Sequence, residues 1–90
     1  MKELNLYNKA VNKQRFIDAA IFAAEIASKK VDAWNRTVWI WEITKCLQAA
    51  GVNLSDYTQA LRIADIARDF SLLFSQLHQL KNLKEKQTEK

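Results

Sequence analysis

The chain has 90 residues, enough for one small domain with a single hydrophobic core. Apolar residues make up 49% of it, a fraction that excludes intrinsic disorder for the chain as a whole. It has no proline and only one glycine, the residues that tight β-turns need, so an all-α fold is expected. The longest apolar stretch falls far short of the ~20 residues of a membrane-spanning helix, and the N-terminus lacks a signal-peptide pattern, so we expect no membrane insertion.

The formal net charge of +4 raises the question of nucleic-acid binding. A protein that binds phosphates gathers several cations on one surface, whereas acids alternate with bases along almost all of this chain. The only local basic pairs are Lys13 with Arg15 and Lys29 with Lys30. We therefore expect most charges to lie on solvated helix faces, with nucleic-acid binding as the alternative. A single cysteine forms no intramolecular disulfide and suits a reducing cytoplasm.

The first half of the sequence predicts two helices before the middle of the chain. Residues 3–11 form a short amphipathic helix, and residues 12–15 are either a turn or its continuation. Residues 16–29 form a clear second helix. Its buried stripe follows the i, i+3, i+4, i+7 spacing and is rich in alanine, which lets a neighbouring helix approach closely: Ile17, Ala20, Ile21, Ala24 and Ala27.

A tryptophan-rich helix over residues 33–50 is expected to be the centre of the fold. Asp32 caps its start, and Gly51, the only glycine, ends it. At 100° per residue its core face comprises Trp39, Ile43, Cys46, Leu47 and Ala50, with Ile40 at the edge. Trp34, Val38, Trp41 and Lys45 fall on nearly the opposite side. A helix that is apolar on two opposed faces must be covered on both.

Two further helices are predicted after Gly51. One spans residues 56–68, with Ser55 or Asp56 as its cap and Leu54 as a hydrophobic staple. The other spans residues 70–83 behind the cap Asp69. Beyond Leu83 the residues are charged and alternate in sign, so we expect a single helical domain over residues 1–84 and a frayed tail over residues 85–90.

An internal repeat relates the two halves of the chain. At an offset of 37 residues, Ala23–Ala27 aligns with Ala60–Ala64 and Asp32 with Asp69. An offset of 40 matches as well locally but loses the pair of aspartates, and amphipathic helices of similar length also resemble one another by chance. The pattern IA-x4-D-x3-R-x3-I-x2-I-x3-L-x3-G, from Ile26 to Gly51, resembles the tetratricopeptide-like helix–turn–helix repeats of bacterial proteins.

That resemblance covers about residues 16–80 and implies alternating A and B helices. It implies four to five antiparallel helices, two stacked repeats deep, closed by a capping helix or a dimer contact. In such families the A helices line a concave surface that takes a peptide segment. Residues 33–50 would be one A helix.

No constellation of catalytic or metal-binding residues is found in the sequence. His78 is the sole histidine and lies on a different predicted helix from Cys46, so a zinc site is not expected. Cys46 falls on an apolar face without a base nearby in the sequence. With one glycine there is no Gly-rich phosphate loop. We predict neither enzymatic activity, nor a catalytic residue, nor a metal, nor a cofactor.

The candidate binding residues are Trp34, Val38, Trp41 and Lys45. Tryptophan is enriched in binding hot spots, because it combines a large apolar area with an N–H donor. Three outcomes are open for this face: cover by the first and last helices of the same chain, a partner protein, or a symmetric homodimer. We predict a non-enzymatic protein-interaction module, with a basic nucleic-acid or nucleoprotein accessory subunit as the alternative.

Overall fold

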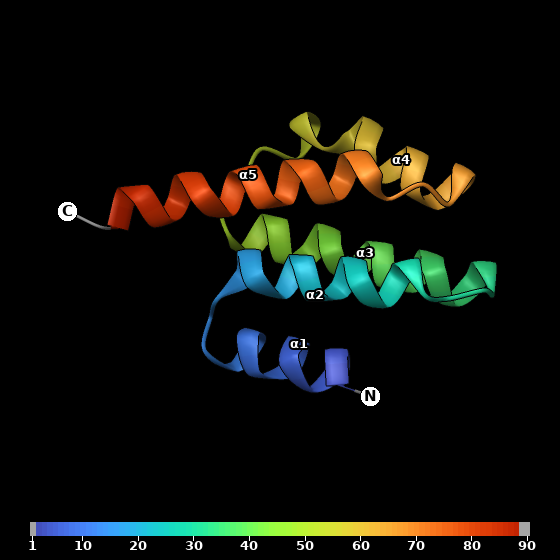
Figure 1. Ribbon diagram of the computed structural model, residues 1–90, viewed down its shortest axis with the longest axis horizontal. Coiled ribbons are helices and arrows are strands. Elements are labelled where there is room, and N and C mark those ends of the chain that lie inside the picture. Colours follow the sequence, from blue (N-terminus) through green and yellow to red (C-terminus); the bar gives the residue numbers. More distant parts are fainter. Residues whose placement is uncertain (1, 89–90) are drawn as a thin grey trace.

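The computed structural model describes the backbone of residues 2–88 and the side chains of residues 2–85. Within that range the chain is all-helical, as predicted, and successive helices run in opposite directions (Figure 1). The elements are α1 (Lys2–Asn12), α2 (Phe16–Ser28), α3 (Ala33–Ala49), the 3₁₀ turn η1 (Leu54–Asp56), α4 (Thr58–Ala67) and α5 (Ser71–Thr88).

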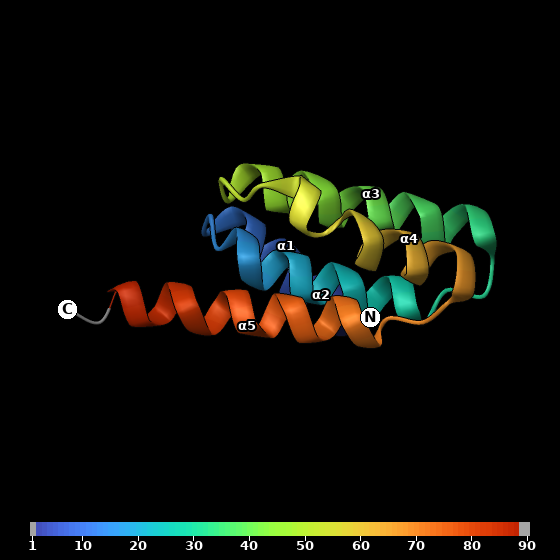
Figure 2. The same ribbon diagram turned by 90° about the horizontal axis from the view of Figure 1, so that it is seen from above.

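Helix α2, and not the tryptophan-rich α3, is the centre of the fold. It packs against α1, α3 and α5, while α4 contacts α3 and α5 (Figures 1 and 2). Contacts therefore run from α2 to α3, α4, α5 and back to α2, which is the order of a four-helix bundle with α1 added on the outside of α2. The 37-residue repeat remains a prediction, because a closed bundle of this kind arises with or without one.

Alanine explains why α2 holds the central position. Small side chains let three neighbouring helices approach its backbone closely. Buried residues lie all round the helix, beyond the predicted stripe, in which Ile17 is only half-buried: Ala19, Ala20, Ile21, Ala23, Ala24, Ile26 and Ala27. The prediction named only one buried face of α2. A helix that neighbours cover on three sides is apolar on most of its surface, so its sequence does not mark all the buried faces.

Two helices end in the same hydrogen-bonded turn, one with glycine and one without. Gly51 has φ +77° and ends α3, as predicted. The amides of Gly51 and Val52 donate to the carbonyls of Gln48 and Leu47, which is a Schellman motif. At the end of α1, Gln14 adopts φ 59°. The amides of Gln14 and Arg15 donate to the carbonyls of Val11 and Ala10 in the same pattern. Residues 13–15 are thus a turn, Asn12 still belongs to α1, and residues 3–29 form two helices.

The second half departs from the predicted boundaries. Ser55 and Asp56 lie in η1 and do not cap α4, which begins two residues later than expected. The Asn53 side chain instead accepts a hydrogen bond from the Ser55 amide at the start of η1. Helix α5 continues beyond Leu83 to Thr88, so residues 85–88 of the predicted tail are helical. Residues 89 and 90 lie outside the described residues.

Both aspartates predicted as caps stand at helix starts. The Asp32 carboxylate accepts hydrogen bonds from the backbone amide of Asn35 at 3.2 Å and from its side-chain amide at 3.0 Å. The Asp69 carboxylate accepts the Ser71 amide at 3.0 Å, and this bond holds the pKa of Asp69 below its usual range.

We expect Asp32→Ala to lower the free energy of unfolding by about 0.5–2 kcal/mol, because it leaves an amide donor at the start of α3 without an acceptor. Chemical denaturation of both proteins measures the difference. Asp32→Asn keeps an acceptor oxygen and should recover most of the loss. Equal losses in the two variants would show that the cap is not the cause.

Candidate functional site

Helix α3 presents one face to the core of the domain. Ile43 and Leu47 are completely buried, and Ile40 and Cys46 nearly so. Trp39 is half-buried and packs its ring edge-to-face against Tyr7 of α1, with the ring centroids 5.2 Å apart. The predicted orientation of Trp39 and Ile43 towards the core is confirmed.

The opposite face of α3 is exposed. Trp34 is 74% exposed, Trp41 60% and Val38 39%, and Lys45 is also exposed. We call these four residues the outer strip. One of the three predicted alternatives, that the first and last helices of the same chain cover this face, is therefore wrong. Tyr7 of α1 contacts α3 on the side of Trp39 and Glu42, and α5 lies across α2 from α3 (Figure 2).

The edge of the outer strip nearest α1 is a small polar network. The Tyr7 hydroxyl donates to Glu42 at 2.8 Å, and the Lys45 ammonium pairs with the same carboxylate at 2.8 Å. Burial, together with the bond to Glu42, raises the pKa of Tyr7. For Glu42, partial burial opposes ionisation, but the hydrogen bonds from Lys45 and Tyr7 outweigh it and hold its pKa below the usual range. The network fixes Lys45 at the rim of the strip with its charge already compensated.

A pH dependence follows from the lowered pKa of Glu42. A carboxylate with a depressed folded-state pKa stabilises the fold above its unfolded pKa, here near the ordinary value of 4.5, and this contribution is lost as the pH falls through the folded-state value. We expect Glu42→Gln to lower stability relative to wild type at pH 7 and to make little difference well below pH 4.5. Urea denaturation at several pH values measures this, and a pH-independent difference would contradict it.

The edge nearest α4 is built on a buried arginine that the sequence did not indicate. Arg36 is 6% exposed, and its Nε donates to the backbone carbonyl of Asp65 at 3.1 Å. The carboxylate of Asp65 accepts the Thr37 hydroxyl at 3.0 Å and lies 3.8 Å from the Arg36 Nε. Because Arg36 is buried, losing these contacts would leave its charge without a partner, so they hold the first half of α3 to the end of α4.

Two other cations are neutralised within the chain. Lys29, which follows α2, pairs with Glu3 of α1, and this contact holds the pKa of Glu3 low. Lys81 of α5 pairs with Asp18 of α2 at 3.0 Å and lies 4.0 Å from Glu85. The charges of these two lysines are therefore compensated within the chain.

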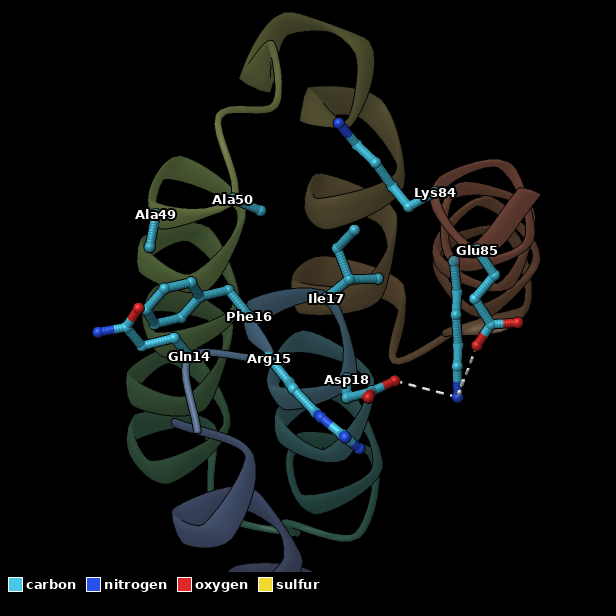
Figure 3. A pocket seen from close by; sticks show the side chains of 10 residues that line it. Gln14, Arg15, Phe16, Ile17, Asp18, Ala49, Ala50, Lys84 and Glu85 are labelled. Atoms are coloured by element: carbon cyan, nitrogen blue, oxygen red, sulfur yellow. Dashed lines mark ion pairs between the residues drawn. The ribbon is translucent and has the colours of Figure 1, made fainter. Parts of the chain in front are cut away.

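An open cleft of about 850 Å³ lies at the other end of the bundle from the start of α3 (Figure 3). Its walls come from the turn between α1 and α2, the end of α3 and the second half of α5: Gln14, Arg15, Phe16, Ile17, Asp18, Ala49, Ala50, Lys81, Lys84 and Glu85. The cleft contains none of the predicted binding residues. In its walls Lys81 pairs with Asp18, and Phe16 and Ile17 contribute apolar side chains.

The residues considered for chemistry do not come together. Burial raises the pKa of the Cys46 thiol, which keeps it protonated and poorly nucleophilic at neutral pH. His78 is exposed on α5 and stacks on Phe74 at 6.5 Å between ring centroids. Among the described residues, no group of three or more His, Cys, Asp and Glu side chains is placed to hold a metal ion. None of the helices within residues 2–88 is both long and apolar enough to cross a membrane.

Comparisons of the chain with protein families, with curated proteins and with solved structures find no match. The most distinctive feature of the structure is the outer strip, which carries two exposed tryptophans between two edges fixed by hydrogen bonds.

Proposed function

We propose that this protein is a non-enzymatic protein-interaction module whose binding surface is the outer strip of α3. One observation carries the proposal: Trp34 and Trp41 are both mostly exposed and lie on the same face of one helix, with Val38 between them. Leaving such side chains in water forgoes the stabilisation that burying an aromatic side chain gives, and contiguous apolar patches on monomers are often functional.

The surroundings of the strip favour binding to a preformed surface. One edge is fixed by the hydrogen bond and ion pair among Tyr7, Glu42 and Lys45. The other edge is fixed by the hydrogen bonds of Arg36 and Thr37 to Asp65. A rigid backbone loses little conformational entropy when a partner docks, so more of the interaction energy appears as affinity. Exposed tryptophans at the centre with charged groups at the rim match the usual composition of binding hot spots.

The resemblance to tetratricopeptide-like repeats supports the same class of function, since such repeats serve as scaffolds for protein binding. Under this proposal the partner is a protein or a second copy of the chain, and no cofactor takes part. A cytoplasmic location remains a prediction from the single, buried cysteine. The internal ion pairs of Lys29, Lys45 and Lys81 weigh against the nucleic-acid alternative.

Site-specific photo-cross-linking in cells that express the chain tests the proposal. A photoreactive phenylalanine analogue replaces Val38 in the middle of the strip, and the matched control places it at Leu83 of α5. Leu83 is an apolar residue that is 60% exposed, as Trp41 is, but lies on another helix. We expect a covalent protein adduct at position 38 that disappears in the Trp34→Ala/Trp41→Ala background. Equal adduct formation at positions 38 and 83, or none at 38, would contradict the proposal.

A further inference from the structure

We infer that the cleft between the α1–α2 turn, the end of α3 and the second half of α5 binds a small anionic amphiphile, a carboxylate that carries one aliphatic chain. The cleft contains no residue of the outer strip, so the inference goes beyond the proposed function and does not rest on it. Three observations support it: the space itself, its apolar walls and the excess of positive charge around it.

The space results from the different lengths of the last two helices. Helix α4 has 10 residues and α5 has 18, so the second half of α5 extends past α4 and past the start of α2 (Figures 1 and 2). The α1–α2 turn and the last turn of α3 form the remaining walls. The volume of about 850 Å³ lies within the ~300–1,000 Å³ that small-molecule sites occupy.

Apolar side chains line the interior of the cleft. Figure 3 shows Ile17 and Ala50 pointing into the space between α3 and α5. Phe16 is half-buried and lies outside the hydrophobic core of the described residues, and Ala49 is exposed. An aliphatic chain in the cleft would remove this apolar surface from water, which is favourable in proportion to the area buried.

Positive charge exceeds negative charge around these walls. Three cations and two acids line the cleft: Arg15, Lys81, Lys84, Asp18 and Glu85. Asp18 is paired with Lys81, whereas none of the ion pairs among the described side chains includes Arg15. A guanidinium is always protonated, and its planar set of N–H donors matches the two oxygens of a carboxylate. Arg15 is therefore available to a bound anion.

The distribution of acids along the chain favours an anion at this end of the bundle. The α1–α2 turn belongs to a stretch without acids, residues 4–17, and the end of α3 belongs to another, residues 43–55. Asp32 and Asp69, by contrast, stand at the helix starts of the opposite end. A carboxylate near Arg15 is attracted by the local charge, whereas an ammonium group would be repelled.

The size of the cleft selects one aliphatic chain and not a partner helix. Three turns of an α-helix, with a diameter of ~10 Å and a pitch of 5.4 Å, fill roughly 1,300 Å³, so the cleft takes such a helix only in part. A membrane surface is reached by apolar side chains that protrude from a protein. Here the apolar side chains lie between three elements of the fold, where a single dissolved chain can enter.

A titration of the purified chain followed by ¹⁵N–¹H NMR tests the inference, with octanoate, hexanoate and 1-octanol as probes below their aggregation concentrations. We expect octanoate to give saturable shifts at residues 14–18, 49–50 and 81–85 and none at residues 34–41. For so small a ligand the dissociation constant should be on the order of millimolar. Hexanoate should bind about 4- to 15-fold more weakly, since each buried methylene contributes up to about four-fold.

Two substitutions separate the charge from the apolar walls. Arg15→Gln should weaken octanoate binding about five-fold, the upper end for an ion pair in contact with solvent, and leave the binding of the uncharged 1-octanol unchanged. Arg62→Gln removes the same charge from an exposed position on α4 outside the cleft and should alter neither. Arg15 is exposed, so its substitution preserves the fold, which far-UV circular dichroism confirms.

Four results would each overturn the inference. They are the absence of saturable shifts with octanoate, shifts that map to the outer strip and not to the cleft, 1-octanol binding as tightly as octanoate, and equal effects of Arg15→Gln and Arg62→Gln. None of them bears on the proposed function, which is decided by cross-linking at position 38.

Discussion

Ile43→Ala is expected to lower the free energy of unfolding by about 2–5 kcal/mol, the usual cost of truncating a large buried aliphatic side chain. Ile43 is 0% exposed and lies in the hydrophobic core on the inner face of α3. The substitution removes its apolar contacts and leaves a cavity that the closely packed helices fill only in part. Urea denaturation followed by far-UV circular dichroism measures the change.

The same substitution on α4 provides the control. Ile66 is 73% exposed, so Ile66→Ala should change stability by no more than about 0.5 kcal/mol, the usual range for surface positions. Equal effects at the two positions would mean that Ile43 does not anchor α3 to the core.

Two tryptophans on the same helix are expected to contribute very differently to the free energy of unfolding. Trp39→Ala should destabilise the domain by about 3 kcal/mol, near the lower end for large aromatic residues, because Trp39 is only half-buried. It removes the contact with Tyr7 that holds α1 on α3. Trp41→Ala should change the stability of the monomer by no more than about 0.5 kcal/mol, because its side chain is mostly in water. Denaturation in dilute solution, where association is negligible, compares the two. A larger loss for Trp41→Ala than for Trp39→Ala would invert the assignment of the two faces.

The orientation of α3 was predictable because its sequence marks both its ends and its phase. Asp32 and Gly51 set the start and the stop, and the large side chains Trp39, Ile43 and Leu47 recur at helical spacing on the buried side. Helical periodicity therefore placed Trp34, Val38 and Trp41 together on the opposite face. It did not predict whether that face is covered, because cover depends on how far α1 and α5 reach.

The features that were missed depend on contacts between distant residues or on backbone shape. Arg36 has no local signal for burial: its acceptor, the carbonyl of Asp65, lies 29 residues away in the sequence. Helix α2 has alanine on several sides, so its periodicity did not reveal three covered faces. Gln14 takes the left-handed conformation usually marked by glycine. Asn53 caps a 3₁₀ turn and not a helix, which moved the start of α4.

The central claim, that the outer tryptophans serve binding and not folding, is tested most directly by the unfolding free energy of Trp34→Ala/Trp41→Ala, measured in dilute solution against wild type. We expect a difference of no more than about 1 kcal/mol, twice the usual limit for a single surface substitution. A loss of about 3 kcal/mol or more would place these side chains in the core and contradict the account.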